Sequence, residues 1–517
     1  MRLVWMIAIF AVLFSLASLA AIYSYGRFVK QGRGVPSTAL PATEWDTTLD
    51  RMIAPKLRAY KGQSGLMLVT SNLQAFATRA LAARSAERSL DLQYYYWKDD
   101  LTGGLLAREV IAAADRGVRV RLLLDDINTK GDDSTYLALD SHPDIEIRLF
   151  NPSRNRANAL RRGIEMALRA FSVTRRMHNK AWIADGRIAI VGGRNIGDAY
   201  FDAAESTNFR DMDLVLVGPV VQQAETVFDE YWNSGVVLPI NSLAGSRKGD
   251  LPGTKTKLEV LLSSGDAQPY LQRLQQEKST EAVLSEEQAI HWTSNARVVA
   301  DPAEKANGSA RESWLANAIF PVIASTTSEL RIISPYFIPG DQGVATLRDL
   351  VGRGANVSVL TNSLAATDVA AVHGAYARYR EPLLAGGVSL HELRPRIVAR
   401  DISLFGSSGA SLHTKAFTVD GESGFIGSFN FDPRSISLNT EMGVLFENPA
   451  LTGEVNAVFA SEVSPASSYR LLWQKGEIAW QDGAGANAKA LDSEPEASIW
   501  RRIAATIIGL LPIESQL

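Results

Sequence analysis

The sequence of 517 residues contains no cysteine and only six histidines. The absence of cysteine excludes disulfide bonds, zinc–thiolate sites and cysteine nucleophiles. Neither charge predominates, because 53 basic and 56 acidic side chains leave a formal net charge of −3. This balance argues against a strongly basic nucleic-acid-binding surface, although a local basic cleft can exist within a neutral total. Any catalysis must therefore depend on side chains other than thiols.

One long apolar segment stands at the start of the chain. Leu3 to Tyr25 carries no charge, and Arg27, Lys30 and Arg33 follow it. A bilayer is crossed by about 20 apolar residues, and the core of a signal peptide has only about 7–15. We therefore predict that residues 1–30 form a single-pass membrane anchor. The alternative is a cleaved signal peptide with Ser18-Leu19-Ala20 as its cleavage site.

The chain repeats one short motif, H-x-K-x-x-x-x-D. Its two copies are His178, Lys180 and Asp185, and His413, Lys415 and Asp420. Two of only six histidines in the same frame indicate a duplicated functional unit. The similarity also continues beyond the motif, since Asn195 and Asn430 follow their motifs at the same offset. A later carboxylate, Asp211 or Glu441, then leads into an apolar run in each copy.

The segments before each motif also correspond, and both have a strand–helix–strand order. That order predicts an α/β fold with a mostly parallel sheet flanked by helices. We expect two homologous domains that face each other at a shared active-site cleft. The predicted boundaries are a first domain at 44–240, a linker at 241–256, a second domain at 257–476, and a loose segment with an apolar helix at 477–517.

Two unduplicated segments allow two interpretations each. The arginine-rich stretch Arg154 to Arg176 either binds anionic lipid headgroups or forms a solvated helix face. The apolar run Ile499 to Leu511 either lies at a membrane surface or docks on the second domain.

A duplicated His-Lys pair suits covalent phosphoryl chemistry. One neutral imidazole attacks phosphorus and the second histidine supplies a proton, so that the reaction needs no metal or cofactor. Lys180 and Lys415 lie two residues from their histidines, on the same face of a strand, and can hold phosphate oxygens.

The supporting polar residues have separate predicted roles. Asn195 and Asn430 can donate to the phosphate, whereas Asp211 and Glu441 can orient a histidine ring. Asp185 and Asp420 belong to the motif and are candidate catalytic residues, with a structural role in holding the following loop as the alternative.

At these residues the sequence resembles the phospholipase D superfamily, and within it the bacterial cardiolipin synthases, particularly the cardiolipin synthase C type. The resemblance is carried by Leu92–Gly103, Met177–Asp202 and Thr361–Arg380. It implies transfer of a phosphatidyl group from a donor phospholipid to phosphatidylglycerol, with His178 as nucleophile and His413 as acid and base. Gly193 departs from the serine that the family has in its first Gly-Ser pair.

The resemblance and the anchor together imply a bacterial inner-membrane enzyme with phospholipid substrates. They leave room for an accessory protein and predict no nucleic-acid partner. Three alternatives share the motif: a phospholipase D that uses water as acceptor, a metal-independent nuclease, and a degenerate scaffold. His373, which follows a strand end, is a further residue that could border the site.

Overall fold

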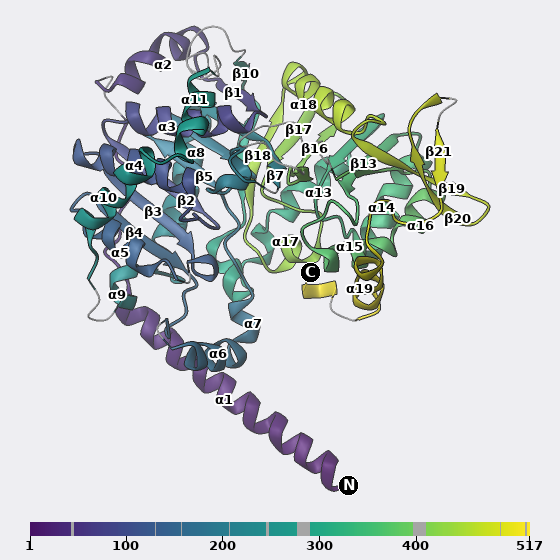
Figure 1. The fold of residues 1–517 in the computed structure, drawn as a ribbon, viewed down its shortest axis with the longest axis horizontal. Coiled ribbons are helices and arrows are strands. Elements are labelled where there is room, and N and C mark those ends of the chain that lie inside the picture. Colours follow the sequence, from purple (N-terminus) through teal and green to yellow (C-terminus); the bar gives the residue numbers. More distant parts are fainter. Residues whose placement is uncertain are drawn as a thin grey trace.

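The computed structural model describes the chain except residues 43–45, 130, 157, 206, 245–247, 277–289, 396–409, 486–487, 512–513 and 517. Two large sheets lie side by side, and one long helix projects from the body (Figure 1). That helix is α1 (Arg2–Gly32), and its segment Val4–Gly32 is long and apolar enough to cross a membrane. The predicted α/β fold with two similar halves and an N-terminal apolar helix is confirmed.

The first sheet has nine strands within the described residues, in the order β10-β1-β8-β6-β5-β2-β3-β4-β9. The strands are β1 (Ser64–Val69), β2 (Ser89–Tyr94), β3 (Arg119–Asp125), β4 (Ile145–Phe150), β5 (Ala181–Ala184), β6 (Ile188–Gly192), β8 (Asp213–Val217), β9 (Val237–Pro239) and β10 (His291–Thr293). The helices of this half are α2 (Thr48–Ala59), α3 (Asn72–Ser85), α4 (Leu101–Asp115), α5 (Asp133–Asp140), α6 (Ala159–Leu168), α7 (Ala170–Val173), α8 (Pro219–Trp232), α9 (Ile240–Ala244), α10 (Leu251–Leu262) and α11 (Ala267–Gln276).

The second sheet repeats this order in its described residues as β11-β18-β17-β16-β12-β13-β14 and continues into β19-β20-β21. Its strands are β11 (Ala296–Ala300), β12 (Glu329–Ile333), β13 (Asn356–Asn362), β14 (Ser389–Leu393), β16 (Ala416–Val419), β17 (Ser423–Gly427), β18 (Met442–Glu447), β19 (Ser468–Gln474), β20 (Glu477–Asp482) and β21 (Lys489–Leu491). Its helices are α13 (Ala316–Ala324), α14 (Gly340–Gly352), α15 (Ala370–Ala377), α16 (Arg380–Ala385), α17 (Pro433–Ser437), α18 (Pro449–Glu462) and α19 (Ile499–Gly509).

Both sheets are mixed rather than mostly parallel, which corrects one detail of the prediction. In the first sheet only the β2–β3 and β3–β4 pairs are parallel among the described strands. The strands on either side of each Asp-Gly turn are too close in sequence for the crossover that parallel pairing requires, so β5–β6 and β16–β17 are antiparallel hairpins.

Several of the predicted boundaries fall within helices and strands of the structure. The expected linker at 241–256 contains α9 and the start of α10, and α10 and α11 pack on α4 and α3 of the first half. The chain leaves the first sheet after Thr293 and joins the second at Ala296. The expected loose tail contains β20, β21 and α19, so the tail belongs to the second half. The predicted start at residue 44 and positions 245–247 lie outside the described residues.

The two halves share one hydrophobic core. Phe228 and Tyr231 of α8 belong to the same buried cluster as Val455 and Phe459 of α18, together with strands from both sheets. Helices α8 and α18 occupy equivalent positions in the duplicated fold and both begin with proline. Because this core joins the halves, residues carried by different sheets are held in fixed relative positions.

Asp185 and Asp420 lie at hairpin turns and not beside the histidines. Both residues have a left-handed backbone with φ of 54°, and Gly186 or Gly421, also with positive φ, follows in the tight turn of each hairpin. The Asp185 carboxylate accepts from the amides of residues 87–89, and Asp420 accepts from those of residues 327–329. Five residues of extended chain separate Lys180 from Asp185, which is about 16 Å. The structural alternative therefore fits both aspartates.

We predict that Asp420→Ala lowers the free energy of unfolding by about 1–3 kcal/mol, because three backbone amides at the start of β12, one of them half-buried, lose a charged acceptor. Chemical denaturation would measure the change. The control Asp349→Ala removes an exposed ion pair with Arg353 and should change stability by at most about 0.5 kcal/mol. Loss of turnover in a folded Asp420→Ala enzyme would contradict the structural assignment.

Candidate active site

The two histidines meet between the halves because each motif segment pairs with the other half of the chain. Strand β15 (Ala410–Leu412) pairs in parallel with β7 (Asn208–Arg210), and the amide of His413 donates to the carbonyl of Arg210 over 2.8 Å. Met177 forms a bridge to Thr440, and the amide of His178 donates to the Thr440 carbonyl over 2.8 Å. Each histidine is thus tied to the backbone just before the opposite carboxylate.

Each histidine contacts the carboxylate of the other half. Nδ1 of His178 lies 2.8 Å from Oε2 of Glu441, and Nδ1 of His413 lies 2.6 Å from Oδ2 of Asp211. Both carboxylates are buried. A carboxylate at Nδ1 favours the tautomer with its proton on that nitrogen, so Nε2 of each ring presents a lone pair. The sequence predicted a carboxylate for each ring but not that the pairs cross between the halves.

One carboxylate of the site belongs to a glutamate and the other to an aspartate, and the neighbouring residues explain this difference. Ser428 Oγ donates to Glu441, whereas the equivalent position in the first half is Gly193. A Cβ at Gly193 would lie only 2.3 Å from the Asp211 carboxylate. The shorter acid therefore occupies the space that a serine side chain would need. This explains the departure at Gly193 and the absence of a hydroxyl contact there.

Both lysines are buried beside their own histidines. Lys180 Nζ donates to the His178 carbonyl over 2.5 Å, and Lys415 makes the equivalent contact with the His413 carbonyl. Burial lowers the pKa of Lys415 to about 8, against the opposing effect of Asp211 and Glu441, and lowers the pKa of Lys180 well below its ordinary value. Two ammonium groups in a dry site form a strong electrostatic attraction for an anion.

The same surroundings keep the histidines neutral. Burial lowers the pKa of His178 to about 4, with Glu441 opposing and Lys180 adding to the shift. Burial and the two lysines hold the pKa of His413 well below its usual value. Burial raises the pKa of Asp211, whereas His178 and Lys180 outweigh burial and keep the pKa of Glu441 below its ordinary value. Near neutral pH, both rings are therefore uncharged bases.

The asparagines have different surroundings. Asn195 Nδ2 donates to the Tyr200 hydroxyl over 3.1 Å, and that hydroxyl lies 3.3 Å from Nε2 of His413. The buried Oδ1 of Asn430 has no hydrogen-bond partner in the described part of the chain. Asn195 is therefore committed to a protein network, and Asn430 retains an unused acceptor, its Oδ1.

Aromatic rings enclose the site, and sequence reasoning gave them no role. The Tyr95 ring packs edge-on against His178 with centroids 5.2 Å apart. Tyr200 and Phe209 lie against His413, each with a centroid separation of 5.0 Å. The run Tyr94-Tyr95-Tyr96 at a strand end could have suggested an aromatic wall at the site. The sequence did not indicate which of the three rings faces a histidine.

His373 lies in a separate ion-pair network and not with the other two histidines. Among the described residues, His373, Glu392 and Glu494 form the one group of His and acidic side chains with the spacing of metal ligands. The Arg380 guanidinium already bonds all three, at distances of 2.6–2.9 Å. This cluster is therefore a salt-bridge network that ties the C-terminal segment to α15 and β14.

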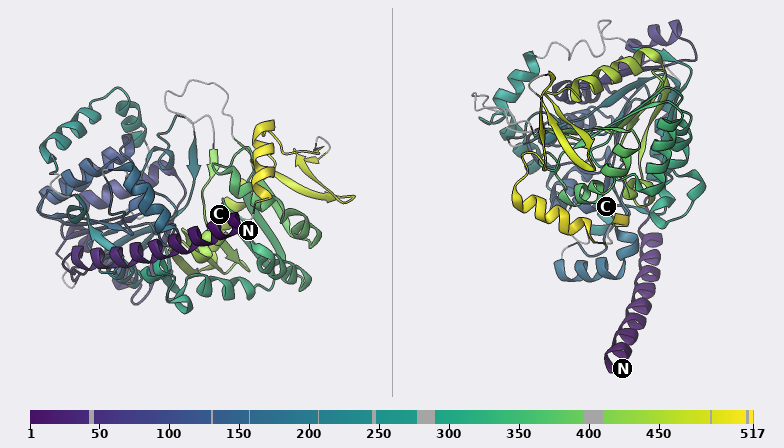
Figure 2. Two further views of the ribbon diagram at one scale, coloured as in Figure 1. Left: turned by 90° about the horizontal axis from the view of Figure 1, so that it is seen from below. Right: turned by 90° about the vertical axis from the view of Figure 1, so that its right-hand side faces the viewer.

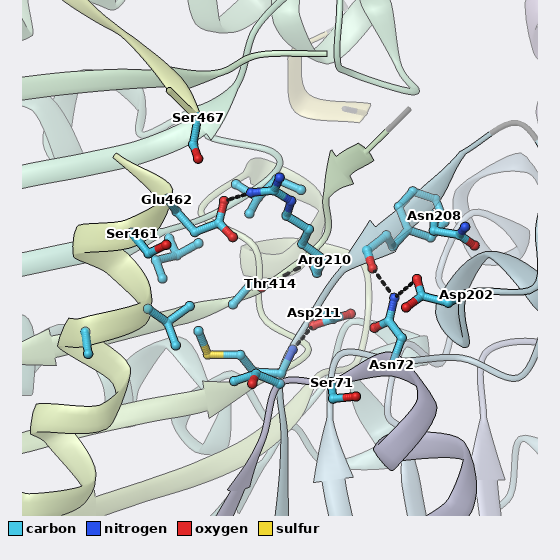
Figure 3. Close-up of a pocket in the computed structure, with 17 residues that line it drawn as sticks. Ser71, Asn72, Asp202, Asn208, Arg210, Asp211, Thr414, Ser461, Glu462 and Ser467 are labelled. Carbon is cyan, nitrogen blue, oxygen red and sulfur yellow. Dashed lines mark hydrogen bonds and ion pairs between the residues drawn. The ribbon is translucent and has the colours of Figure 1, made fainter. Parts of the chain in front are cut away.

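A cavity of about 720 Å³ opens between the halves on the carboxylate side of His413 (Figure 3). Asp211 and Thr414 line it, and Arg210 pairs across it with Glu462 of α18. The equivalent space in the first half is filled by Tyr231, whose hydroxyl donates to the Asp301 carbonyl over 2.7 Å. The counterpart of Tyr231 in α18 is the small Ser461. The cavity adjoins Asp211 and not the reactive Nε2 atoms.

Comparison with known proteins places this arrangement in a family. The family model described as "Cardiolipin synthase, PLD-like domain" matches residues 82–232 and 319–463. The chain belongs to this family. It is an enzyme of the phospholipase D superfamily, in its phosphatidyltransferase branch, and the family implies phospholipid substrates.

Individual relatives agree with this assignment. The chain is 40% identical to Cardiolipin synthase C of Escherichia coli K12 over 469 residues, which cover 89% of this chain and 98% of that one. It is 27% identical to Cardiolipin synthase A of Pseudomonas entomophila over 436 residues, 83% of this chain and 75% of that one. The solved phosphatidylserine synthase of Haemophilus influenzae Rd KW20 shares the fold, with a TM-score of 0.55 and 12% identity over 90% of this chain and all of that one.

We predict that Glu441→Gln and Asp211→Asn each lower kcat by at least about 10²-fold, because an amide no longer fixes the ring tautomer as a carboxylate does. Steady-state kinetics on the purified enzyme would measure this. The control is Glu454→Gln, which changes a His–carboxylate pair outside the site, 2.9 Å from His291, and should leave kcat unchanged. Equal turnover in all three variants would contradict the orienting role.

The pKa of Lys415 predicts an alkaline limit to activity. Its ammonium group is charged below pH 8 and becomes neutral above it, so kcat/KM should fall as the pH rises through about 8. Lys415→Arg keeps its charge, so the alkaline fall of kcat/KM in a pH–rate profile should move to higher pH. An alkaline limb that stays in place in that variant would rule out Lys415 as its source.

Proposed function

We propose that this chain makes cardiolipin by transferring a phosphatidyl group from a donor phospholipid to phosphatidylglycerol through a phosphohistidine intermediate. The observation that carries the proposal is the pair of buried, neutral histidines, each held at Nδ1 by a carboxylate of the other half. The similarity to Cardiolipin synthase C over almost the whole of both chains supports cardiolipin as the product.

In the first step His178 is the proposed nucleophile. Its Nε2 has no hydrogen-bond partner among the described residues, whereas Nε2 of His413 lies beside the Tyr200 hydroxyl. The Nε2 lone pair of His178 attacks phosphorus and the bond from phosphorus to the leaving oxygen breaks. His413 gives its proton to that oxygen, so the donor headgroup departs as an alcohol.

The second step reverses the proton transfer. His413, now neutral, removes the proton from a glycerol hydroxyl of phosphatidylglycerol, and that oxygen attacks phosphorus. The phosphorus–nitrogen bond breaks and His178 is regenerated. His413 acquires its first proton when the phosphodiester binds, because the negative phosphate offsets Lys180 and Lys415, which otherwise lower the pKa of His413.

The remaining residues position the phosphate. Lys180 and Lys415 act as point charges on its oxygens, and Asn430 supplies an amide donor. Asn195 acts through Tyr200 and positions His413. Burial of both histidines favours transfer over hydrolysis, because a dry site limits the access of water to the intermediate.

The apolar helix α1 is the proposed single-pass anchor in the bacterial inner membrane. Among the described side chains of the apolar run from Val4 to Tyr25, none is buried in the structure, which suits a lipid environment. We further propose that the first domain extends to Thr293 and that the second begins at Ala296, since these residues end one sheet and start the other.

The roles of the histidines can be tested by trapping the intermediate. His178→Ala and His413→Ala should each lower cardiolipin synthesis by about 10³-fold or more. Brief exposure to a donor labelled in its phosphatidyl group should leave label on His178 in the His413→Ala enzyme, and none in the His178→Ala enzyme.

His391→Ala is the control, because this histidine lies on β14 away from the site and should leave synthesis unchanged. Label on His413 in the His178→Ala enzyme would reverse the assigned roles. Phosphatidic acid as the only product of the wild-type enzyme with phosphatidylglycerol present would favour the phospholipase D alternative.

A further inference from the structure

An apolar stripe runs along the outward face of α19. Trp500, Ile503, Ile507 and Leu510 recur at the three- and four-residue spacing of one helix face, and Trp500 and Leu510 are 77% and 81% exposed. Soluble proteins rarely leave such a contiguous face in water. The stripe therefore indicates a surface that meets an apolar partner.

The opposite face of α19 is firmly attached to the second half. Ala505 is buried against Gly374 of α15, where an added Cβ would lie 2.3 Å from the Ala505 carbonyl oxygen. Arg501 donates to the Thr367 carbonyl over 2.6 Å, and Arg502 donates to the Glu494 carbonyl over 2.7 Å. The helix thus docks by one face, as one interpretation of the sequence expected, while the body holds the apolar face outward.

Helix α6 carries a smaller apolar face of the same kind. Leu160 and Ile164, one turn apart, are 74% and 52% exposed. Several arginines of this segment face inward: Arg156 pairs with Asp126 and Asp133, and Arg169 pairs with Glu165. These arginines stabilise the segment, and because they are buried in ion pairs they neither bind headgroups nor form a solvated helix face.

Contacts with α1 indicate where α6 lies along the axis of that helix. The Tyr25 hydroxyl donates to the Pro152 carbonyl over 2.8 Å, the Arg169 guanidinium stacks on the Tyr25 ring, and Arg154 lies over the Phe28 ring. Tyr25 is also the last residue of the apolar run, before the charged Arg27. If α1 spans a bilayer, α6 therefore lies at the boundary between lipid and water.

Both helices lie at the end of the globular body from which α1 projects (Figures 1 and 2). Both are also connected to the site. The chain runs from α7 to His178 within five residues. Helix α19 is bonded to Thr367, and the next residue, Asp368, lies close enough to Lys415 to oppose the lowering of that lysine's pKa by burial. A surface that includes both helices would hold the site next to the bilayer.

We propose that a docking face, made of Leu160 and Ile164 on α6, Trp500, Ile503 and Ile507 on α19, and Leu510 directly after α19, inserts into the headgroup region of the bilayer that α1 crosses. This inference rests on the proposed function, since it presents the two histidines to lipid headgroups without removing the lipids from the membrane. Continuity with α1 identifies the partner as a bilayer and not as a second protein.

The absence of cysteine permits a direct test on the full chain. Single variants Ile503→Cys and Leu160→Cys carry an environment-sensitive fluorophore, and the protein is reconstituted in vesicles of phosphatidylethanolamine and phosphatidylglycerol. Both labels should show blue-shifted emission of several-fold higher intensity and should be quenched by nitroxide-labelled lipid. The control is Val260→Cys on α10, 66% exposed and outside the docking face, whose label should remain in water.

Labels at positions 503 and 160 that resemble the label at 260 would overturn the proposal. So would labels shielded from water but insensitive to nitroxide lipid, because a second protein copy would then cover the face. These readouts need no turnover. A wild-type enzyme that makes only phosphatidic acid would therefore contradict the proposed function and leave the docking face intact.

A second variant links the docking face to catalysis. Ile503→Glu with Ile507→Glu should lower activity on long-chain lipids in vesicles about tenfold and leave activity on a short-chain, water-soluble phospholipid unchanged. Val260→Glu should change neither activity, and thermal unfolding would verify that all variants fold. An equal loss on both substrates in a folded protein would assign α19 to support of the site instead.

Discussion

The contact of each histidine with a carboxylate of the opposite half is the interaction on which the site depends. Neither half forms a His–carboxylate pair of the site by itself, because Glu441 serves His178 and Asp211 serves His413. The shared core between α8 and α18 has to hold both pairs at hydrogen-bond distance. Packing far from the reacting atoms therefore controls the tautomer and orientation of both rings.

The duplication also explains the electrostatics of the site. Two copies of one motif bring two lysines and two histidines into a single buried volume, where like charges oppose one another and burial opposes all of them. Because both histidines are neutral, the two carboxylates balance the charges of the two lysines. A phosphodiester adds negative charge, and we propose that its binding is therefore coupled to the protonation of His413.

The sequence predicted the two-domain fold, the apolar helix and the residues that meet at the site, because a repeat of this length fixes equivalent positions in both halves. It could not predict which carboxylate serves which histidine, since that depends on the packing of α8 against α18. The role of Asp185 and Asp420 remained open because a repeated motif spacing does not distinguish a catalytic carboxylate from one at an Asp-Gly turn. The boundary that we propose near Thr293 differs from the predicted linker, because the sequence up to the start of α10 resembles a polar linker although α10 packs on the first half.

The central claim is a two-step transfer through a covalent intermediate, and the stereochemistry at phosphorus tests it most directly. A donor phospholipid with a phosphorothioate of one known configuration would be supplied together with phosphatidylglycerol, and the configuration of the product would be determined. Two successive in-line displacements, first by His178 and then by the glycerol hydroxyl, predict overall retention. Inversion would mean that the acceptor attacks the donor directly, and the phosphohistidine would then have no part in the reaction.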